Sequence, residues 1–259
     1  MILEGKTVLV AGVGAGLGRE VAEAALRDGA NLLLAARTES TLEQAAKDLD
    51  PSGARVAFRR TDISDPADCE ALVALGEERF GALDALVQVA AFEQSFGGLH
   101  DTDLESWRRA YETNVLGTLT LLRAVHPAMK RAGGGSVVLI GSQSMFKVSL
   151  PQPGYAASKS ALLTAMYYLA QELGPDNVRL NMVIPSWMWG PPVEAFLSAR
   201  AKNEGRSTED VVGEVTRDFA LKRMTEDGEV AEAAIFFCSD RAKAITGQHL
   251  LVNCGELMR

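Results

Sequence analysis

The chain has 259 residues, of which 47% are hydrophobic, and it carries a formal net charge of −8 from 34 acidic and 26 basic residues. That length can bury a substantial core, and α/β folds of this size are commonly single domains. The acidic balance, without a cluster of Lys or Arg, argues against nucleic acid or an anionic membrane surface as a partner. No apolar run approaches the roughly 18 residues of a membrane span, and the N-terminus leads straight into a strand rather than a signal sequence, so we expect a soluble, cytoplasmic protein.

Apolar segments of strand length alternate along the chain with amphipathic segments of helix length. In the first half, the expected strands and the helices that follow them are Thr7–Val13 and Leu17–Arg27, Asn31–Ala35 and Ser40–Leu49, Arg55–Arg59 and Pro66–Phe80, and Ala85–Ala90 and Leu104–Lys130. In the second half they are Ser136–Ile140 and Tyr155–Leu173, Val178–Ile184 with a long helical insertion after it, and His249–Val252 after the helix Glu229–Ser239. Such alternation predicts an α/β protein with a doubly wound parallel β-sheet and helices on both faces.

The turn after the first expected strand is rich in glycine, with the sequence Gly12-Val13-Gly14-Ala15-Gly16-Leu17-Gly18. It does not satisfy the strict G-x-G-x-x-G spacing, but it places G-x-x-x-G-x-G directly between a strand and a helix. The missing Cβ atoms permit a tight turn and let a pyrophosphate approach backbone N–H groups at the helix N-terminus. A merely flexible turn is the alternative, and the flanking strand and helix favour nucleotide binding by Gly12, Gly14, Gly16, Leu17 and Gly18.

Cofactor choice is expected at the end of the second strand, where the chain reads Ala35-Ala36-Arg37. A site that prefers NAD usually offers an acidic residue there, whereas Arg37 can bind a 2′-phosphate by charge-assisted hydrogen bonds. This favours NADP over NAD, although an arginine stacked on adenine or simply solvated leaves NAD open. Asp62, after the third strand, is the expected partner of the adenine amino group.

Ser142, Tyr155 and Lys159 can form a proton-transfer site. Tyr155 and Lys159 are spaced as i and i+4, so on a helix they share one face. An adjacent cation favours the phenolate, and we expect Lys159 to lower the pKa of Tyr155. A bare Tyr-x-x-x-Lys arises easily by chance, but here a buried strand ends at Ser142, and sites in open α/β sheets form at such strand ends.

Taken together, these motifs resemble those of the short-chain dehydrogenase/reductase family in its single-domain form of about 250 residues, over the whole length of the chain. By this resemblance Ser142, Tyr155 and Lys159 match the catalytic serine, tyrosine and lysine, and Asn114 matches the asparagine of the long central helix. The resemblance also implies further cofactor contacts, which are Ile63, Ala90, Tyr155, Lys159, Pro185 and Met188.

The family resemblance further implies a Rossmann fold in one domain, residues 1–259. Its nucleotide-binding half is expected at about 1–130, its catalytic part at about 131–259 and its substrate lid at about 187–225. A homotetramer or homodimer is implied as well. The implied reaction is reversible hydride transfer between NAD(P) and a carbonyl carbon, with Tyr155 as acid or base, Ser142 on the substrate oxygen and a water anchored by Asn114.

Several positions depart from the family pattern. The usual Asn-Asn-Ala-Gly is Gln88-Val89-Ala90-Ala91, the usual Pro-Gly is Pro185-Ser186, the threonine that follows is Gly190, and the late Asp-Gly-Gly is Asn253-Cys254-Gly255. Two alternatives therefore stay open. One is a different reaction on the same scaffold, such as reduction of a 3-oxoacyl thioester, epimerisation or dehydration, and the other is a regulatory protein that binds the cofactor without chemistry.

The expected substrate is a small, apolar secondary alcohol or ketone. Ser142, Phe146, Trp187 and Trp189 are the candidate contacts, because large apolar side chains stand next to the catalytic serine and in the expected lid. Packing within the lid or at a subunit interface explains the same side chains equally well. The three cysteines and three histidines are scattered without the spacing of metal ligands, so no metal is expected.

Overall fold

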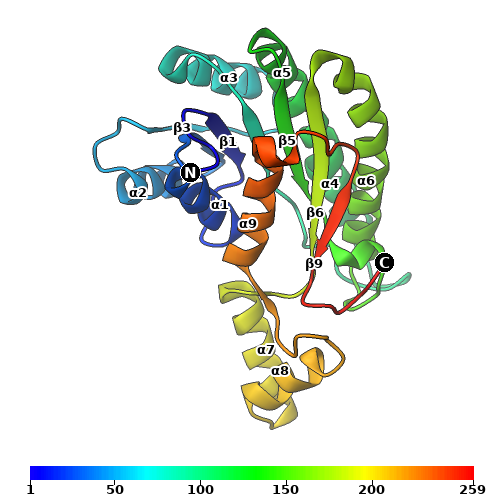
Figure 1. Ribbon diagram of the computed structural model, residues 1–259. Coiled ribbons are helices and arrows are strands. Elements are labelled where there is room, and N and C mark those ends of the chain that lie inside the picture. The colour runs from blue at the N-terminus through cyan, green and yellow to red at the C-terminus, as the bar shows by residue number, and fades with distance from the viewer.

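Seven parallel strands form one sheet at the centre of the molecule (Figure 1). The computed structural model describes all residues from 1 to 259. In sheet order the strands are β3 (Val56–Arg60), β2 (Asn31–Ala36), β1 (Thr7–Ala11), β4 (Ala85–Gln88), β5 (Gly135–Ile140), β6 (Val178–Pro185) and β9 (His249–Val252). The chain leaves β1 toward one edge of the sheet and β4 toward the other, so the carboxyl ends of these neighbours border the crevice where open α/β sheets bind ligands. The predicted single-domain, doubly wound Rossmann-type fold is confirmed.

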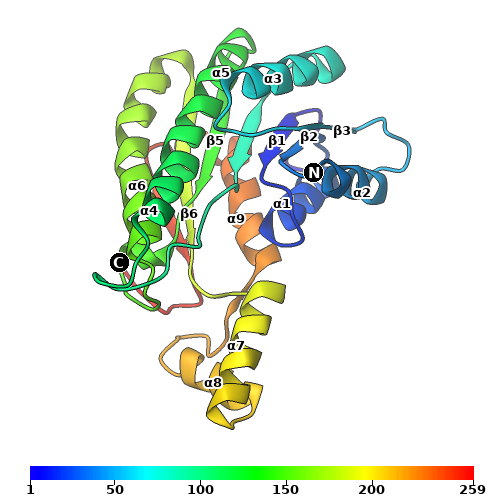
Figure 2. The same ribbon diagram turned by 180° about the vertical axis from the view of Figure 1, so that it is seen from behind.

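Helices cover both faces of this sheet (Figure 2). One face carries α1 (Leu17–Arg27), α2 (Glu39–Leu49) and α9 (Asp227–Cys238), and the other carries α3 (Pro66–Phe80), α4 (Leu104–Tyr111), α5 (Thr118–Arg131) and α6 (Pro153–Leu173). Successive side chains of a strand point to opposite faces. Leu32 and Leu34 accordingly belong to one buried cluster and Leu33 to the other. Burial on both faces explains why the strands are apolar without alternation.

The long helix predicted at Leu104–Lys130 contains one wide turn, a π-helical segment at Glu112–Gly117 between α4 and α5. A π turn inside an α-helix frequently lies at a functional site, because the extra residue redirects side chains. Asn114 lies in this turn and is fully buried. Periodicity alone does not reveal such a turn, since the helix continues on both sides of it.

The long helical insertion predicted after the sixth strand consists of α7 (Pro191–Glu204) and α8 (Thr208–Thr216), which stand away from the sheet below its carboxyl edge (Figure 1). A two-stranded sheet of β7 (Met188–Trp189) and β8 (Thr225–Glu226) joins the two ends of this unit. Single-turn 3-10 helices at Gln143–Met145, Gly174–Asp176 and Asp240–Ala242 complete the chain. The unit from residue 187 to 225 is called the lid segment below.

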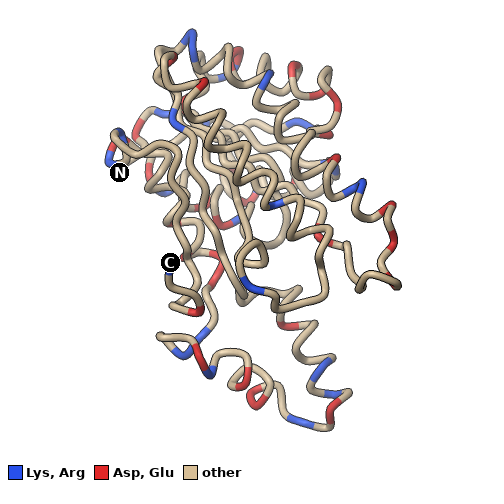
Figure 3. The backbone as a smooth tube through the Cα atoms, turned by 90° about the vertical axis from the view of Figure 1, so that its right-hand side faces the viewer, with Lys and Arg blue, Asp and Glu red and all other residues tan.

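Charged side chains of both signs are interspersed over the exposed helices (Figure 3). Within the lid segment, Arg200 and Arg206 each form ion pairs with both Glu204 and Glu214. None of the helices combines the length and the apolar composition that a membrane crossing demands.

Candidate active site

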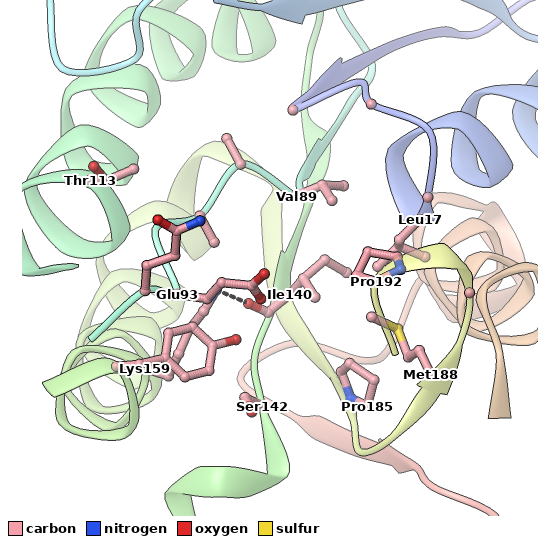
Figure 4. A pocket seen from close by; sticks show the side chains of 18 of the residues that line it. Leu17, Val89, Glu93, Thr113, Ile140, Ser142, Lys159, Pro185, Met188 and Pro192 are labelled. Atoms are coloured by element: carbon pink, nitrogen blue, oxygen red, sulfur yellow. Dashed lines mark hydrogen bonds between the residues drawn. The ribbon is translucent and has the colours of Figure 1, made fainter. Parts of the chain in front are cut away.

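A cavity of about 830 Å³ opens along the carboxyl edge of the sheet and extends to the lid segment (Figure 4). Residues from the glycine-rich turn, the ends of β2 to β6, the first turn of α6 and the lid segment line it. Of the predicted site residues, those on its wall are Gly12, Gly14, Gly16, Leu17, Arg37, Asp62, Ile63, Ala90, Ser142, Tyr155, Lys159, Pro185, Trp187 and Met188. The fold therefore brings residues far apart in the sequence to one concave surface, which is the usual form of a small-molecule site.

The glycine-rich turn is shaped by close backbone contacts. Gly12 has φ 103°, a region that favours glycine, and a Cβ there would clash with the backbone of Ala90. A Cβ on Gly18 would clash with the carbonyl oxygen of Gly12, so this residue packs the turn against α1 instead of lining the cavity. Gly14 faces open space. The N-terminus of α1, at Gly16 and Leu17, is thus accessible to an anion, and the turn fits the pyrophosphate of a dinucleotide.

The catalytic candidates converge at the other end of the cavity. Ser142 follows β5, and Tyr155 and Lys159 lie one turn apart near the start of α6, which begins at Pro153. The Nζ atom of Lys159 lies 5.8 Å from the centre of the Tyr155 ring and donates a 2.7 Å hydrogen bond to the carbonyl oxygen of Ile140. Lys159 is 3% exposed, so this bond gives a buried cation its fixed position beside the cavity (Figure 4).

Asn114 joins the wide turn of the long helix to this site. Its Nδ2 atom donates to the carbonyl oxygen of Phe92 and to the Oγ atom of Ser158, both at 2.9 Å, and its Oδ1 atom accepts from the N–H of Phe92 at 2.7 Å. The main-chain carbonyl oxygen of Asn114 accepts a 2.9 Å bond from Thr118 and keeps its second lone pair. The side chain thus holds the loop after β4 against α6, one residue before Lys159.

Comparison with known proteins matches this geometry to a family. A family model described as enoyl-(acyl carrier protein) reductase matches residues 12–256. The chain belongs to the short-chain dehydrogenase/reductase family. Human dehydrogenase/reductase SDR family member 4 is 32% identical over 260 residues, which cover 99% of this chain and 89% of the human protein. Oxidoreductase UcpA of Salmonella typhimurium is 30% identical, with 99% and 96% covered.

Among solved structures, L-sorbose reductase from Gluconobacter frateurii, complexed with NADPH and L-sorbose, superposes on this short-chain dehydrogenase/reductase with a TM-score of 0.92. It is 28% identical, and the match covers 100% of both chains. The similarity thus extends over the whole fold, the lid segment included.

The departures of this short-chain dehydrogenase/reductase from the family pattern have structural counterparts. Gln88 is buried, and its Nε2 atom donates to the carbonyl oxygen of Ala90 and to Thr118 Oγ1, which ties β4 to the start of α5. The Ser186 hydroxyl donates to Glu256 near the C-terminus. Asn253 is buried and donates a 2.5 Å bond to the side chain of Gln143, the residue after Ser142. These bonds fasten the strand ends around the cavity without the usual family residues.

The expected effect of Lys159 on Tyr155 is wrong for this structure. Burial raises the pKa of Tyr155 to about 12, the Ser142 hydroxyl lowers it only in part, and Glu93 raises it further. Burial also lowers the pKa of Lys159 to about 8, against an opposing effect of Glu93. Both shifts follow from the cost of placing a charge in a poorly solvated site. The phenol is therefore protonated at neutral pH, the form that donates a proton.

Arg37 is exposed at the mouth of the cavity and has no ion pair or hydrogen bond within the protein. Asp62 lines the same end, and its Oδ1 atom accepts a 2.9 Å bond from the N–H of Ser64. The free guanidinium and the fixed carboxylate lie where the sequence placed the adenosine end of the cofactor. Their arrangement suits a ribose phosphate and an adenine amino group.

Of the candidate substrate contacts, Trp187 lines the cavity and stacks on Phe196 of α7 with ring centres 6.1 Å apart. Trp189 does not line it, because pairing of β7 with β8 turns this side chain toward the small core of the lid segment. Phe146 also lies outside, packed under the guanidinium of Arg259 at 4.2 Å. The structure thus places one of the three large candidates at the cavity.

Two acidic residues on the cavity wall escaped sequence reasoning. Glu93, in the loop after β4, projects its carboxylate into the cavity next to the Lys159–Ile140 hydrogen bond (Figure 4). Asp227, the first residue of α9, has an oxygen 3.1 Å from where a Cβ of Gly16 would be and 3.0 Å from where a Cβ of Gly190 would be. Neither stands in a motif, and the start of a helix gives an aspartate an ordinary explanation as a capping residue.

Proposed function

We propose that this protein interconverts a secondary alcohol and a ketone by hydride transfer with NAD(P), with Tyr155 as the acid and base. The observation that carries the proposal is the convergence of Ser142, Tyr155 and Lys159 on one wall of a cavity whose opposite end is a glycine turn open to a pyrophosphate. The reductase from Gluconobacter frateurii, complexed with NADPH and L-sorbose, supports this reaction type by its similarity over the full chain.

The roles of the side chains follow from their positions. The dinucleotide, when bound, supplies or accepts the hydride. The Ser142 hydroxyl and the Tyr155 phenol hold the substrate oxygen from two sides, and the phenol donates its proton to that oxygen during reduction. In the reverse direction the phenol must lose its proton, and the positive charge of Lys159 favours this loss. Asn114, whose carbonyl oxygen keeps a lone pair, is proposed to hold the water that returns the proton.

We further propose that the cofactor is NADP, on the support of the unpaired Arg37 guanidinium and the absence of a carboxylate next to it at the end of β2. The remaining assigned contacts, which are Ile63, Ala90, Pro185 and Met188, lie on the cavity wall between the two ends. The lid segment is proposed to close over the substrate and exclude water, with Trp187 as its apolar contact.

A carrier-bound enoyl or oxoacyl thioester is the second candidate substrate, because the matching family model bears the description of such a reductase. The lid segment gives it less support. An acidic carrier needs a basic docking surface, and the ion pairs of Arg200 and Arg206 with Glu204 and Glu214 neutralise the charge there.

Replacing Tyr155 tests the proposal. In Tyr155→Phe the ring stays and the proton donor is lost, so kcat for ketone reduction should fall by about 100-fold or more, while the Kd for the reduced cofactor, measured by fluorescence, changes by less than about 3-fold. Exposed Tyr168 on the far side of α6 provides the matched control, Tyr168→Phe, which should leave both quantities unchanged. A Tyr155→Phe variant that keeps more than about a tenth of the wild-type kcat would contradict the assigned role.

A further inference from the structure

The cavity holds three carboxylates, and only one of them lies at the catalytic end. Asp62 stands at the adenosine end and Asp227 beside the glycine-rich turn. The Glu93 carboxylate lies close enough to act electrostatically on both Tyr155 and Lys159. A carboxylate beside a reacting carbonyl is costly unless something pairs with it, because a cavity closed by the lid segment excludes water.

The backbone of Glu93 is fixed while its side chain is free. Its carbonyl oxygen accepts hydrogen bonds from Gln152 Nε2 at 3.1 Å and from the N–H of Ser95 at 2.8 Å, and Asn114 holds the preceding residue through both polar atoms of its amide side chain. The carboxylate has no hydrogen bond and no ion pair within the protein. A side chain that is held at its root and unpaired at its tip is available to a ligand.

We propose that Glu93 accepts hydrogen bonds from hydroxyl groups of the substrate, so that the enzyme acts on a small polyhydroxylated ketone or alcohol and rejects substrates with a carboxylate near the carbonyl. This inference rests on the proposed alcohol and ketone chemistry of the same site. It goes beyond that chemistry by naming the class of substrate.

Hydroxyl groups fit Glu93 better than an ammonium group does. A carboxylate accepts strong hydrogen bonds from O–H donors, at about twice the strength of a bond between neutral groups. A cationic substrate would pair with Glu93 but would also face the buried ammonium of Lys159 at short range. An anionic substrate would meet Glu93 itself. A neutral molecule rich in O–H groups satisfies the carboxylate without either repulsion.

The opposite wall of the cavity agrees with this class of substrate. Trp187 and Phe196 present stacked aromatic rings from the lid segment. A polyol carries C–H groups on one side of its carbon chain and hydroxyls on the other, so it can contact the rings and the carboxylate at once. Gln94 and Gln152, on the same wall as Glu93, offer further amide groups to hydroxyls.

The experiment compares three carbonyl substrates of six carbons, a methyl ketone, a ketohexose and an oxo acid, with wild type and Glu93→Gln. The substitution removes the charge and keeps the size. Its general effect on Tyr155 and Lys159 is common to all three substrates, so the ratios of kcat/KM isolate recognition. We expect kcat/KM for the ketohexose, relative to the methyl ketone, to fall about 10-fold or more, and that for the oxo acid to rise about 10-fold.

Two controls accompany the ratios. Glu105→Gln removes an exposed carboxylate of α4 that does not line the cavity, and it should leave all three ratios unchanged. Glu93→Asp keeps the charge on a shorter side chain and should retain the discrimination against the oxo acid. Reduction of the methyl ketone with unaltered ratios in Glu93→Gln would overturn the role of Glu93 and leave the proposed function standing. Reduction of none of the three substrates with either cofactor would overturn both.

Discussion

Arg37 provides a quantitative test of cofactor selection. In the free protein its guanidinium is exposed and breaks no internal ion pair on binding, so a contact to a 2′-phosphate adds its full strength. Hydrogen bonds to charged groups contribute about 1.5–3 kcal/mol, and exposure to water places this one near the lower bound. We therefore expect Arg37→Ala to raise the Kd for NADPH about 10-fold, since 1.4 kcal/mol is one decade, and to change the Kd for NADH less than about 2-fold.

The assay is fluorescence titration of the two reduced cofactors at low and high salt. Screening shortens from about 10 Å at 0.1 M to about 3 Å at 1 M ionic strength, so the wild-type preference for NADPH should shrink at high salt and that of Arg37→Ala should not. Arg59→Ala is the matched control, because Arg59 is an exposed arginine of the next strand, β3, that does not line the cavity. Equal weakening of both cofactors in Arg37→Ala would refute the assignment of this arginine to a phosphate.

The remaining predictions concern the lid, the pH dependence and the phosphate end. Trp187→Ala should lower kcat/KM for the preferred substrate about 10-fold, because about 25 cal/mol per Å² of apolar contact is lost, while Trp189→Ala should lower the melting temperature instead; equal kinetic losses would contradict this division. Ketone reduction, assayed from pH 6 to 10, should be flat at low pH and fall as pH rises through the pKa of about 8 of Lys159, because that step removes a positive charge beside Tyr155, and an undiminished rate at pH 10 would contradict it. Burial raises the pKa of Asp227, so its ionised form is disfavoured and gains in proportion as pH rises through that pKa; Asp227→Asn should tighten cofactor binding about 3- to 10-fold at pH 8, an effect that fades toward pH 4, and weaker binding at pH 8 would show that the carboxylate holds the cofactor.

The order of strands and helices could be predicted because it rests on periodicity and on turn residues. The glycine turn at Gly12 and the spacing of Tyr155 and Lys159 are local signals that survive without coordinates. The wide turn at Asn114 could not be predicted, since it depends on hydrogen bonds to residues 22 and 44 positions away. Glu93 lies in an irregular loop, where no periodicity indicates which way a side chain points.

Burial explains the other differences between sequence and structure. The rule that a cation lowers the pKa of a nearby phenol holds in a well solvated site, but desolvation is the larger effect at Tyr155. The direction of Trp189 is set by two residue pairs between β7 and β8, a sheet too short to leave an alternating pattern. Both outcomes depend on what surrounds a side chain, which a single sequence does not record.

The bonds of Asn114 have a consequence for how this enzyme can change over time. They hold the loop that carries Glu93 through the backbone of Phe92, and the Glu93 side chain takes no part in them. Selection can therefore exchange the residue at position 93 for a neutral, basic or apolar one without loosening the loop or moving Tyr155. Substrate range and proton transfer are inherited on separate parts of the same scaffold, so a duplicated copy of the gene could acquire a new substrate in one mutational step while its chemistry is preserved.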